Sequence, residues 1–187
     1  MYDDSRHVRN RLKNQTDGHP QALTAGFFKI NVPARKTTLL DGGVGKFNTT
    51  TKSTVALAVT RLLCLPETSP SGSPSLSDFA NGFCYISSFL TSQKEILEAV
   101  QRVTGTSPSD WTIEDIKAEE YIQEGKQRVA KGDFGGTVNI LGGMIFRGGM
   151  GGDYESVKGV SNEALGLPKE SLDEVVKETL GELATKG

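Results

Sequence analysis

The segment from residue 83 to residue 105 constrains the fold more than any other part of the chain. Phe83-Cys84-Tyr85-Ile86-Ser87 combines aromatic and β-branched side chains, which predicts a buried central strand. Ser92-Gln93-Lys94-Glu95 follows with the pattern of a capping box, and Gly105 suits the end of the helix that the box would begin. The predicted apolar face of this helix consists of Ile96, Leu97, Val100 and Val103. A strand that leads into a capped helix favours an α/β fold.

Other predicted elements alternate in the same way. The sequence predicts the end of a buried strand over 22–28, a strand over 37–40 and another over 111–113. It predicts helices over 55–63, over 118–131 and from Pro168 onward. The first of these is apolar on nearly all sides, so we expect it to be well buried, with Thr54 as its N-cap.

Two segments differ from this pattern. Residues 1–20 are polar and predict an exposed amino-terminal helix and loop. Residues 66–82 are rich in serine and proline and predict a flexible surface loop within the domain that we expect over 21–187.

Composition excludes several classes of protein. The net charge of −2 gives no field that would attract nucleic acid or an anionic membrane, and no apolar run reaches the length of a membrane span. Two histidines and two cysteines without a C-x-x-C pattern argue against a metal site. Cys64 and Cys84 lie among apolar residues, so we expect buried free thiols and a cytoplasmic protein.

Glycine is unusually frequent near the carboxyl end. Four of the glycine pairs, at 135–136, 142–143, 148–149 and 151–152, interrupt the stretch after Gly132. No G-x-G-x-x-G opens a helix after a strand, so we predict a mobile loop beside a pocket rather than a phosphate cradle. The acidic pairs Glu114-Asp115 and Glu119-Glu120 are expected to be solvated, and no catalytic residue is assigned.

The aromatic pair Phe27-Phe28 follows Gly26 directly at the end of a predicted strand. Ligands of α/β folds bind at the carboxyl edge of the sheet, where these rings would lie. Ordinary core packing is an equal alternative for both side chains.

Several stretches, taken in order, resemble the carboxy-terminal half of the NmrA-like and isoflavone-reductase-like proteins. They are Thr24-Ala25-Gly26-Phe27-Phe28, Asp41-Gly42-Gly43 with Phe47-Asn48-Thr49-Thr50-Thr51, Ser87-Ser88-Phe89 with Thr91 to Leu97, and Asn162 to Pro168. The resemblance extends from about residue 8 to the end. It implies the carboxy-terminal portion of a Rossmann-like NAD(P)-binding fold with a small substrate-side α+β region.

The resemblance also implies a function and a site. It implies an oxidoreductase that uses NADP(H) on a small organic substrate, with the dinucleotide-binding half missing from this chain, so that another chain would have to supply it. Residues near the cofactor would be Thr24, Gly26 and Phe27. The substrate pocket would include Phe27, Phe28, Phe47, Gly149, Met150 and Gly151.

Two alternatives stay open at this point. The family's proton-transferring lysine falls at about Ser5 here, which favours a non-catalytic binding or regulatory module that contacts other proteins. A truncated gene product is the other alternative. In either case an incomplete sheet would expose an edge strand and an apolar face, so we expect self-association.

Overall fold

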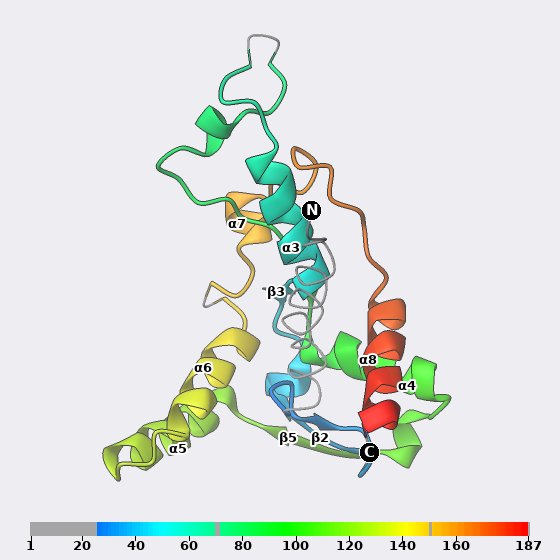
Figure 1. The fold of residues 1–187 in the computed structure, drawn as a ribbon. Coiled ribbons are helices and arrows are strands. Elements are labelled where there is room, and N and C mark those ends of the chain that lie inside the picture. The colour runs from blue at the N-terminus through cyan, green and yellow to red at the C-terminus, as the bar shows by residue number, and fades with distance from the viewer. Residues whose placement is uncertain (1–25, 70–71, 150, 187) are drawn as a thin grey trace, which may run out of the picture.

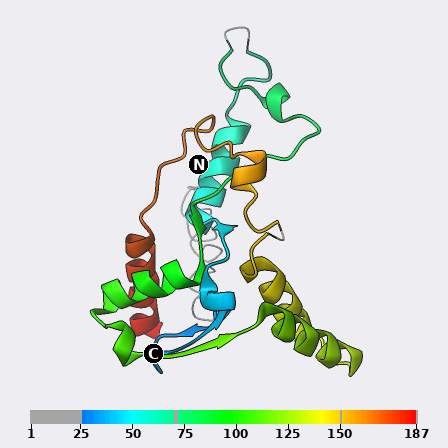
Figure 2. The ribbon, with the colours of Figure 1, turned by 180° about the vertical axis from the view of Figure 1, so that it is seen from behind.

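A computed structural model describes residues 26–69, 72–149 and 151–186 of the chain. The helix predicted within residues 1–20, and most of the strand predicted over 22–28, lie outside these ranges. Figure 1 shows a sheet at one end of the molecule, with helices α4 and α8 on one side and the α5–α6 hairpin projecting on the other. The opposite view in Figure 2 shows the same arrangement.

The fold is mixed α/β, as predicted. The main sheet has the order β1-β2-β5, formed by Ile30–Asn31, Lys36–Leu40 and Thr112–Ile116. Strands β2 and β5 are parallel, and β1 is antiparallel to β2. Parallel neighbours require a long crossover, and helix α4 (Gln93–Thr104) lies on it, as expected for part of a Rossmann-like sheet. A second sheet pairs β3 (Phe47–Thr49) with β4 (Phe89–Thr91).

Helix α4 confirms the strongest local signals of the sequence. The Ser92 side chain accepts a hydrogen bond from the Glu95 amide, and Gly105 ends the helix in the left-handed conformation with φ of 65°. Ile96, Leu97 and Val100 are buried in the main hydrophobic core. Helix α8 (Leu172–Lys186) runs beside α4 and packs against it. Helix α8 begins four residues after Pro168, so the start predicted at that proline is wrong.

The strand predicted over Phe83–Ser87 is wrong, because pairing with β3 begins only at Phe89. The polar groups of this segment find other partners. The Tyr85 carbonyl accepts from the Ser161 amide, and the Ser87 amide donates to the Asn162 side chain at 3.1 Å. These bonds tie the segment to a loop near the carboxyl end instead of to a neighbouring strand.

Helix α3 (Lys52–Leu63) is less buried than predicted. Its N-cap is Thr51 rather than Thr54, and the Thr51 hydroxyl accepts from the Thr54 amide at 3.2 Å. Only one side packs, against a small cluster built on Ala58, Leu165 and Leu167, so the remaining apolar side chains of the helix face outward. Leu63, for example, is 71% exposed.

The neighbouring loop and the two cysteines also differ in part from expectation. Cys64 is exposed and Cys84 partly buried, so the prediction of burial is wrong for Cys64, although both thiols are free. Within residues 66–82 a short 3-10 helix forms over Leu76–Phe79, capped by Ser75.

The glycine-rich stretch is helical over much of its length, which corrects the predicted loop. Helix α6 (Gly136–Phe146) packs along helix α5 (Ala118–Ala130), and the two form a hairpin. Glycines make this contact unusually close: a Cβ added at Gly136 would lie 2.3 Å from the Gly125 carbonyl oxygen. The loss of conformational freedom that disfavours glycine in helices is thus offset by packing that a larger residue would prevent.

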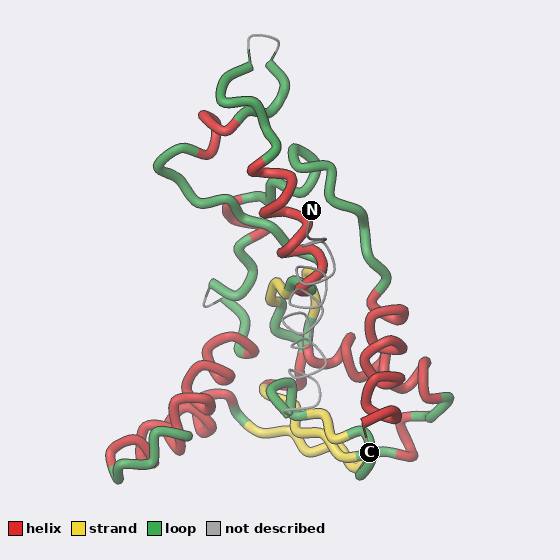
Figure 3. Tube along the Cα trace, viewed as in Figure 1, coloured by secondary structure: helices red, strands yellow, loops and turns green. Residues whose placement is uncertain are grey.

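The rest of the chain connects these parts. Helix α7 (Glu155–Lys158) is a single turn, and a long connection without regular helix or strand leads from it to α8 (Figure 3). Among the described residues, no helix is both long and apolar enough to cross a membrane.

Candidate functional site

Four phenylalanine rings meet where the main sheet, β3 and α6 come together. Ring centroids are 5.1 Å apart for Phe47 and Phe146, 5.9 Å for Phe28 and Phe47, and 5.5 Å for Phe27 and Phe146. Phe47 and Phe146 are buried, whereas Phe27 and Phe28 are only partly buried. Gly45 permits this approach, because a Cβ there would lie 2.1 Å from the Phe146 carbonyl oxygen.

Gln93 holds Phe28 at the carboxyl end of strand β2. Its side-chain amide is fully buried and donates to the Phe28 carbonyl at 3.1 Å, while its oxygen accepts from the Leu40 amide at 2.9 Å. A buried amide with both ends bonded positions its neighbours well, since either group left unpaired would carry a desolvation cost. Phe28 therefore sits at the sheet edge where α/β folds bind ligands.

A small apolar slot of about 60 Å³ opens beside Phe28. Helix α8 forms one wall of this slot, and strands β3 and β4 together with α4 form the other. The lining residues are Phe28, Thr49, Thr51, Phe89, Ile96, Leu172, Val175, Val176 and Thr179. Hydrophobic side chains with a few hydroxyls are typical of sites for small organic molecules.

Glu170 accepts hydrogen bonds from three hydroxyl groups at the polar end of the slot. Its carboxylate accepts from Thr51 at 2.9 Å and from Thr54 at 2.6 Å, and also from Ser88. The carboxylate lies at the amino terminus of α3, where unpaired amides and the helix dipole favour a negative charge. Thr51 belongs both to this cluster and to the slot lining, so Glu170 fixes the direction of its hydroxyl hydrogen.

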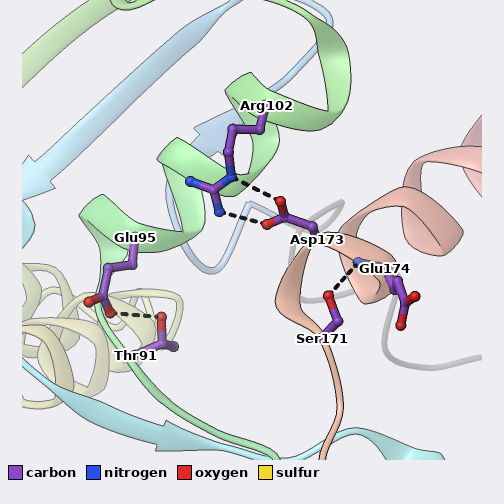
Figure 4. A network of polar contacts seen from close by, with 6 residues as sticks. All are labelled: Thr91, Glu95, Arg102, Ser171, Asp173 and Glu174. Atoms are coloured by element: carbon purple, nitrogen blue, oxygen red, sulfur yellow. Dashed lines mark hydrogen bonds and ion pairs between the residues drawn. The ribbon is translucent and has the colours of Figure 1, made fainter.

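An ion pair near the start of α8 joins this helix to α4 beside the slot (Figure 4). Arg102 of α4 donates two hydrogen bonds to Asp173 of α8, at 2.9 and 2.6 Å. These bonds hold the pKa of the Asp173 carboxyl below its ordinary value. Glu95, at the start of α4, accepts from Thr91 at 3.2 Å and from Lys46, whose hydrogen bond is the main cause of a lowered pKa at Glu95.

The structure brings some of the predicted site residues together and separates others. Phe27, Phe28 and Phe47 share the aromatic cluster, with only Phe28 lining the slot. Gly26 lines a different, larger hollow of about 470 Å³ along β1 and β2, whose side chains are mostly exposed. Thr24 and Met150 lie outside the described residues.

The loop predicted to form a pocket wall runs past the aromatic cluster. The Gly152 carbonyl accepts from the Asn48 amide at 2.8 Å, and a Cβ at Gly152 would lie 3.1 Å from the Cβ of Phe47. Gly149 and Gly151 do not line the slot. The loop is therefore anchored beside Phe47 through Gly152.

Sequence reasoning missed Gln93 and Glu170 as site residues. Glu170 is 119 positions from Thr51 along the chain, and no local pattern indicates the contact. Gln93 carries a weak signal, because it is a polar residue at a position that belongs to the apolar face of its helix. The acidic residues 114–115 and 119–120 are exposed, as predicted. In the part of the chain that the structure describes, no group of three or more His, Cys, Asp or Glu residues could hold a metal ion.

Two fungal proteins are similar to this chain. Oxidoreductase aprR of Aspergillus flavus is 28% identical over 191 residues, which cover 96% of this chain and 60% of that protein. Oxidoreductase poxI of Penicillium oxalicum is 31% identical over 147 residues, which cover 76% of this chain and 42% of that protein. The chain therefore spans less than two thirds of the length of these curated relatives. No protein-family model and no solved structure matches it.

Proposed function

We propose that this chain is the substrate-side portion of an NAD(P)H-dependent oxidoreductase of the NmrA-like kind. The observation that carries the proposal is the similarity, over 96% of the chain, to a protein named as an oxidoreductase, with a second such relative over 76%. The reaction would add a hydride from the reduced cofactor and a proton from solvent or a side chain to a small organic substrate.

The described residues do not fit the diphosphate of a dinucleotide. Such a group needs an open helix amino terminus after a strand. The amino terminus of α3 follows β3 but is filled by the Glu170 carboxylate, which would repel a phosphate. The first turn of α4 follows β4 but is capped by Ser92 and carries the Glu95 carboxylate. The first turn of α5 follows β5 but carries Glu119 and Glu120, and these carboxylates would likewise repel a phosphate. The cofactor cradle is therefore expected outside the described residues, in a longer product of the gene or in a partner chain.

The slot beside Phe28 supports a role for this chain in holding the substrate. Its volume of about 60 Å³ corresponds to roughly two water molecules, so it would accept a methyl group or the edge of a ring rather than a whole substrate. The hydroxyl of Thr49 suits a carbonyl or hydroxyl at the margin of that group, whereas the hydroxyl hydrogen of Thr51 is already donated to Glu170. Phe27 and Phe28 would offer flat apolar contact to the remainder.

The test uses this chain alone and the chain co-expressed with the part of the Aspergillus relative that the alignment leaves uncovered. We expect tight NADPH binding by calorimetry, and NADPH oxidation with a panel of aromatic ketones, only in the co-expressed pair. Val176→Phe fills the slot and should abolish turnover while leaving NADPH binding intact. Tight NADPH binding by the chain alone, or no oxidation by the pair, would contradict the proposal.

A non-catalytic binding or regulatory module is the second candidate. It is favoured by the lining of the slot, none of whose residues carries a side chain that exchanges protons near neutral pH. The same experiment separates the two functions. Binding of panel compounds that Val176→Phe abolishes, without NADPH oxidation by the pair, would support the module.

A further inference from the structure

The α5–α6 hairpin carries an apolar stripe that no described part of the chain covers. Phe134, Val138, Leu141 and Met144 recur at spacings of four, three and three, so they lie along one side of helix α6 and the turn before it. Phe134 is 78% exposed and Leu141 51% exposed. Figures 1 and 2 both show the hairpin projecting from the body of the molecule.

The hairpin cannot turn this stripe inward. The opposite side of α6 is already buried against α5 through Gly136, Asn139 and Gly143. A Cβ at Gly143 would lie 2.4 Å from a side-chain carbon of Ile122, so the two helices are in the closest contact that glycine allows. The stripe is therefore a fixed outer surface of a packed unit.

The charges around α6 suit a second copy of the same helix. Residues 136–146 contain no charged side chain, so two copies can meet without like-charge repulsion. Asp133 precedes the helix and Arg147 follows it, which puts opposite charges at its two ends. In an antiparallel pair related by a two-fold axis, each Asp133 would lie near Arg147 of the second copy.

We propose that α6 is a self-association surface, through which two copies of this chain pair with their helices antiparallel. An 11-residue helix is only about 16 Å long, and one such stripe buries less than the roughly 1,600 Å² of a standard interface. The dimer is consequently reversible and depends on concentration. The partner's stripe replaces the water now in contact with Phe134, Val138 and Leu141.

Analytical ultracentrifugation over a hundredfold concentration range tests this surface. The unmodified chain should shift from monomer to dimer. Leu141→Glu places a charge in the centre of the stripe and should raise the dissociation constant at least tenfold. Val59→Glu is the matched control, because Val59 is an equally exposed apolar residue, at 51%, on helix α3. A monomer at all concentrations, or equal weakening by both variants, would overturn the proposal.

Charge exchange tests the antiparallel geometry. Asp133→Arg or Arg147→Asp alone should weaken the dimer about as much as Leu141→Glu, because each puts like charges next to each other. The combined variant should regain most of the dimer, although it loses the internal pairs of Asp133 with Arg128 and of Arg147 with Glu119. Additive weakening in the combined variant would rule out this pairing.

Discussion

Replacement of Gly125 by alanine is a sharp test of the close packing between α5 and α6. Gly125 lies in the middle of α5, and a Cβ there would be 2.6 Å from the Gly136 carbonyl oxygen and 2.9 Å from carbons of Asn139 and Ile140. Ordinary van der Waals contact begins at about 3.4 Å. The nearest atom belongs to the backbone, so a side-chain rotation cannot relieve the overlap and the helices must separate.

Two opposing effects decide the result. Alanine is favoured over glycine inside a helix by about 1 kcal/mol. Overpacking of a tight contact costs about 1–3 kcal/mol, and the backbone overlap puts Gly125→Ala at the upper end of that range. We therefore expect a net loss of about 1–2 kcal/mol in the free energy of unfolding, or a few degrees in Tm for a chain of this size.

Gly181→Ala is the matched control. Gly181 also lies within a helix, α8, but a Cβ there meets no heavy atom within 4 Å. That variant should gain about 0.5–1 kcal/mol. Thermal unfolding followed by circular dichroism gives the Tm of both variants, and hydrogen exchange localises the Gly125→Ala effect to residues 118–146. If Gly125→Ala raised the Tm as Gly181→Ala does, the packing argument would be refuted.

Three further changes test the contacts around the slot. Gln93→Leu leaves the buried Leu40 amide without its acceptor and should cost about 1–3 kcal/mol in denaturant unfolding, whereas an unchanged midpoint would contradict its positioning role. Glu170→Ala removes the shared acceptor of three hydroxyls and should cost a similar amount, with Glu170→Gln losing less because its amide oxygen still accepts; equal losses would argue against the hydrogen bonds. Arg102 holds the pKa of Asp173 below its ordinary value, so this pair stabilises the fold near neutral pH and loses its effect as the pH falls through the lowered pKa. Asp173→Asn should therefore have a lower Tm than the unmodified chain near neutral pH, and this difference in Tm should become smaller at acid pH. A difference in Tm that stayed constant across the pH range would exclude the ion pair as its cause.

Local signals predicted the parts of the fold whose determinants lie close together in the chain. The cap at Ser92 and the left-handed Gly105 bounded α4 correctly, since both act within one turn of the helix. Strands β2 and β5 and helix α5 were also found, with shifts of a few residues at most. The class of fold followed from their alternation.

Predictions that depended on distant partners were less successful. The apolar content of α3 predicted burial, but the described structure supplies packing for only one side of it. The β-branched and aromatic residues of Phe83–Ser87 predicted a strand, but β3 pairs with the residues that follow. Glycine frequency predicted a loop where α6 forms, because helix propensity takes no account of the close contact between Gly125 and Gly136.

The same distinction between local and long-range determinants applies to the candidate site. The sequence by itself determined that Phe27 and Phe28 follow a glycine before β2, that Ser92 caps α4, and that a helix follows near the carboxyl end. Only the tertiary structure decided that Glu170 meets Thr51 and that α8 closes the slot beside Phe28. Caps and turns are set by side-chain and backbone groups a few residues apart. The slot and its hydroxyl cluster depend on side chains far apart in the chain, such as Thr51 and Glu170 at a separation of 119 positions, whose meeting is selected by packing of the whole chain.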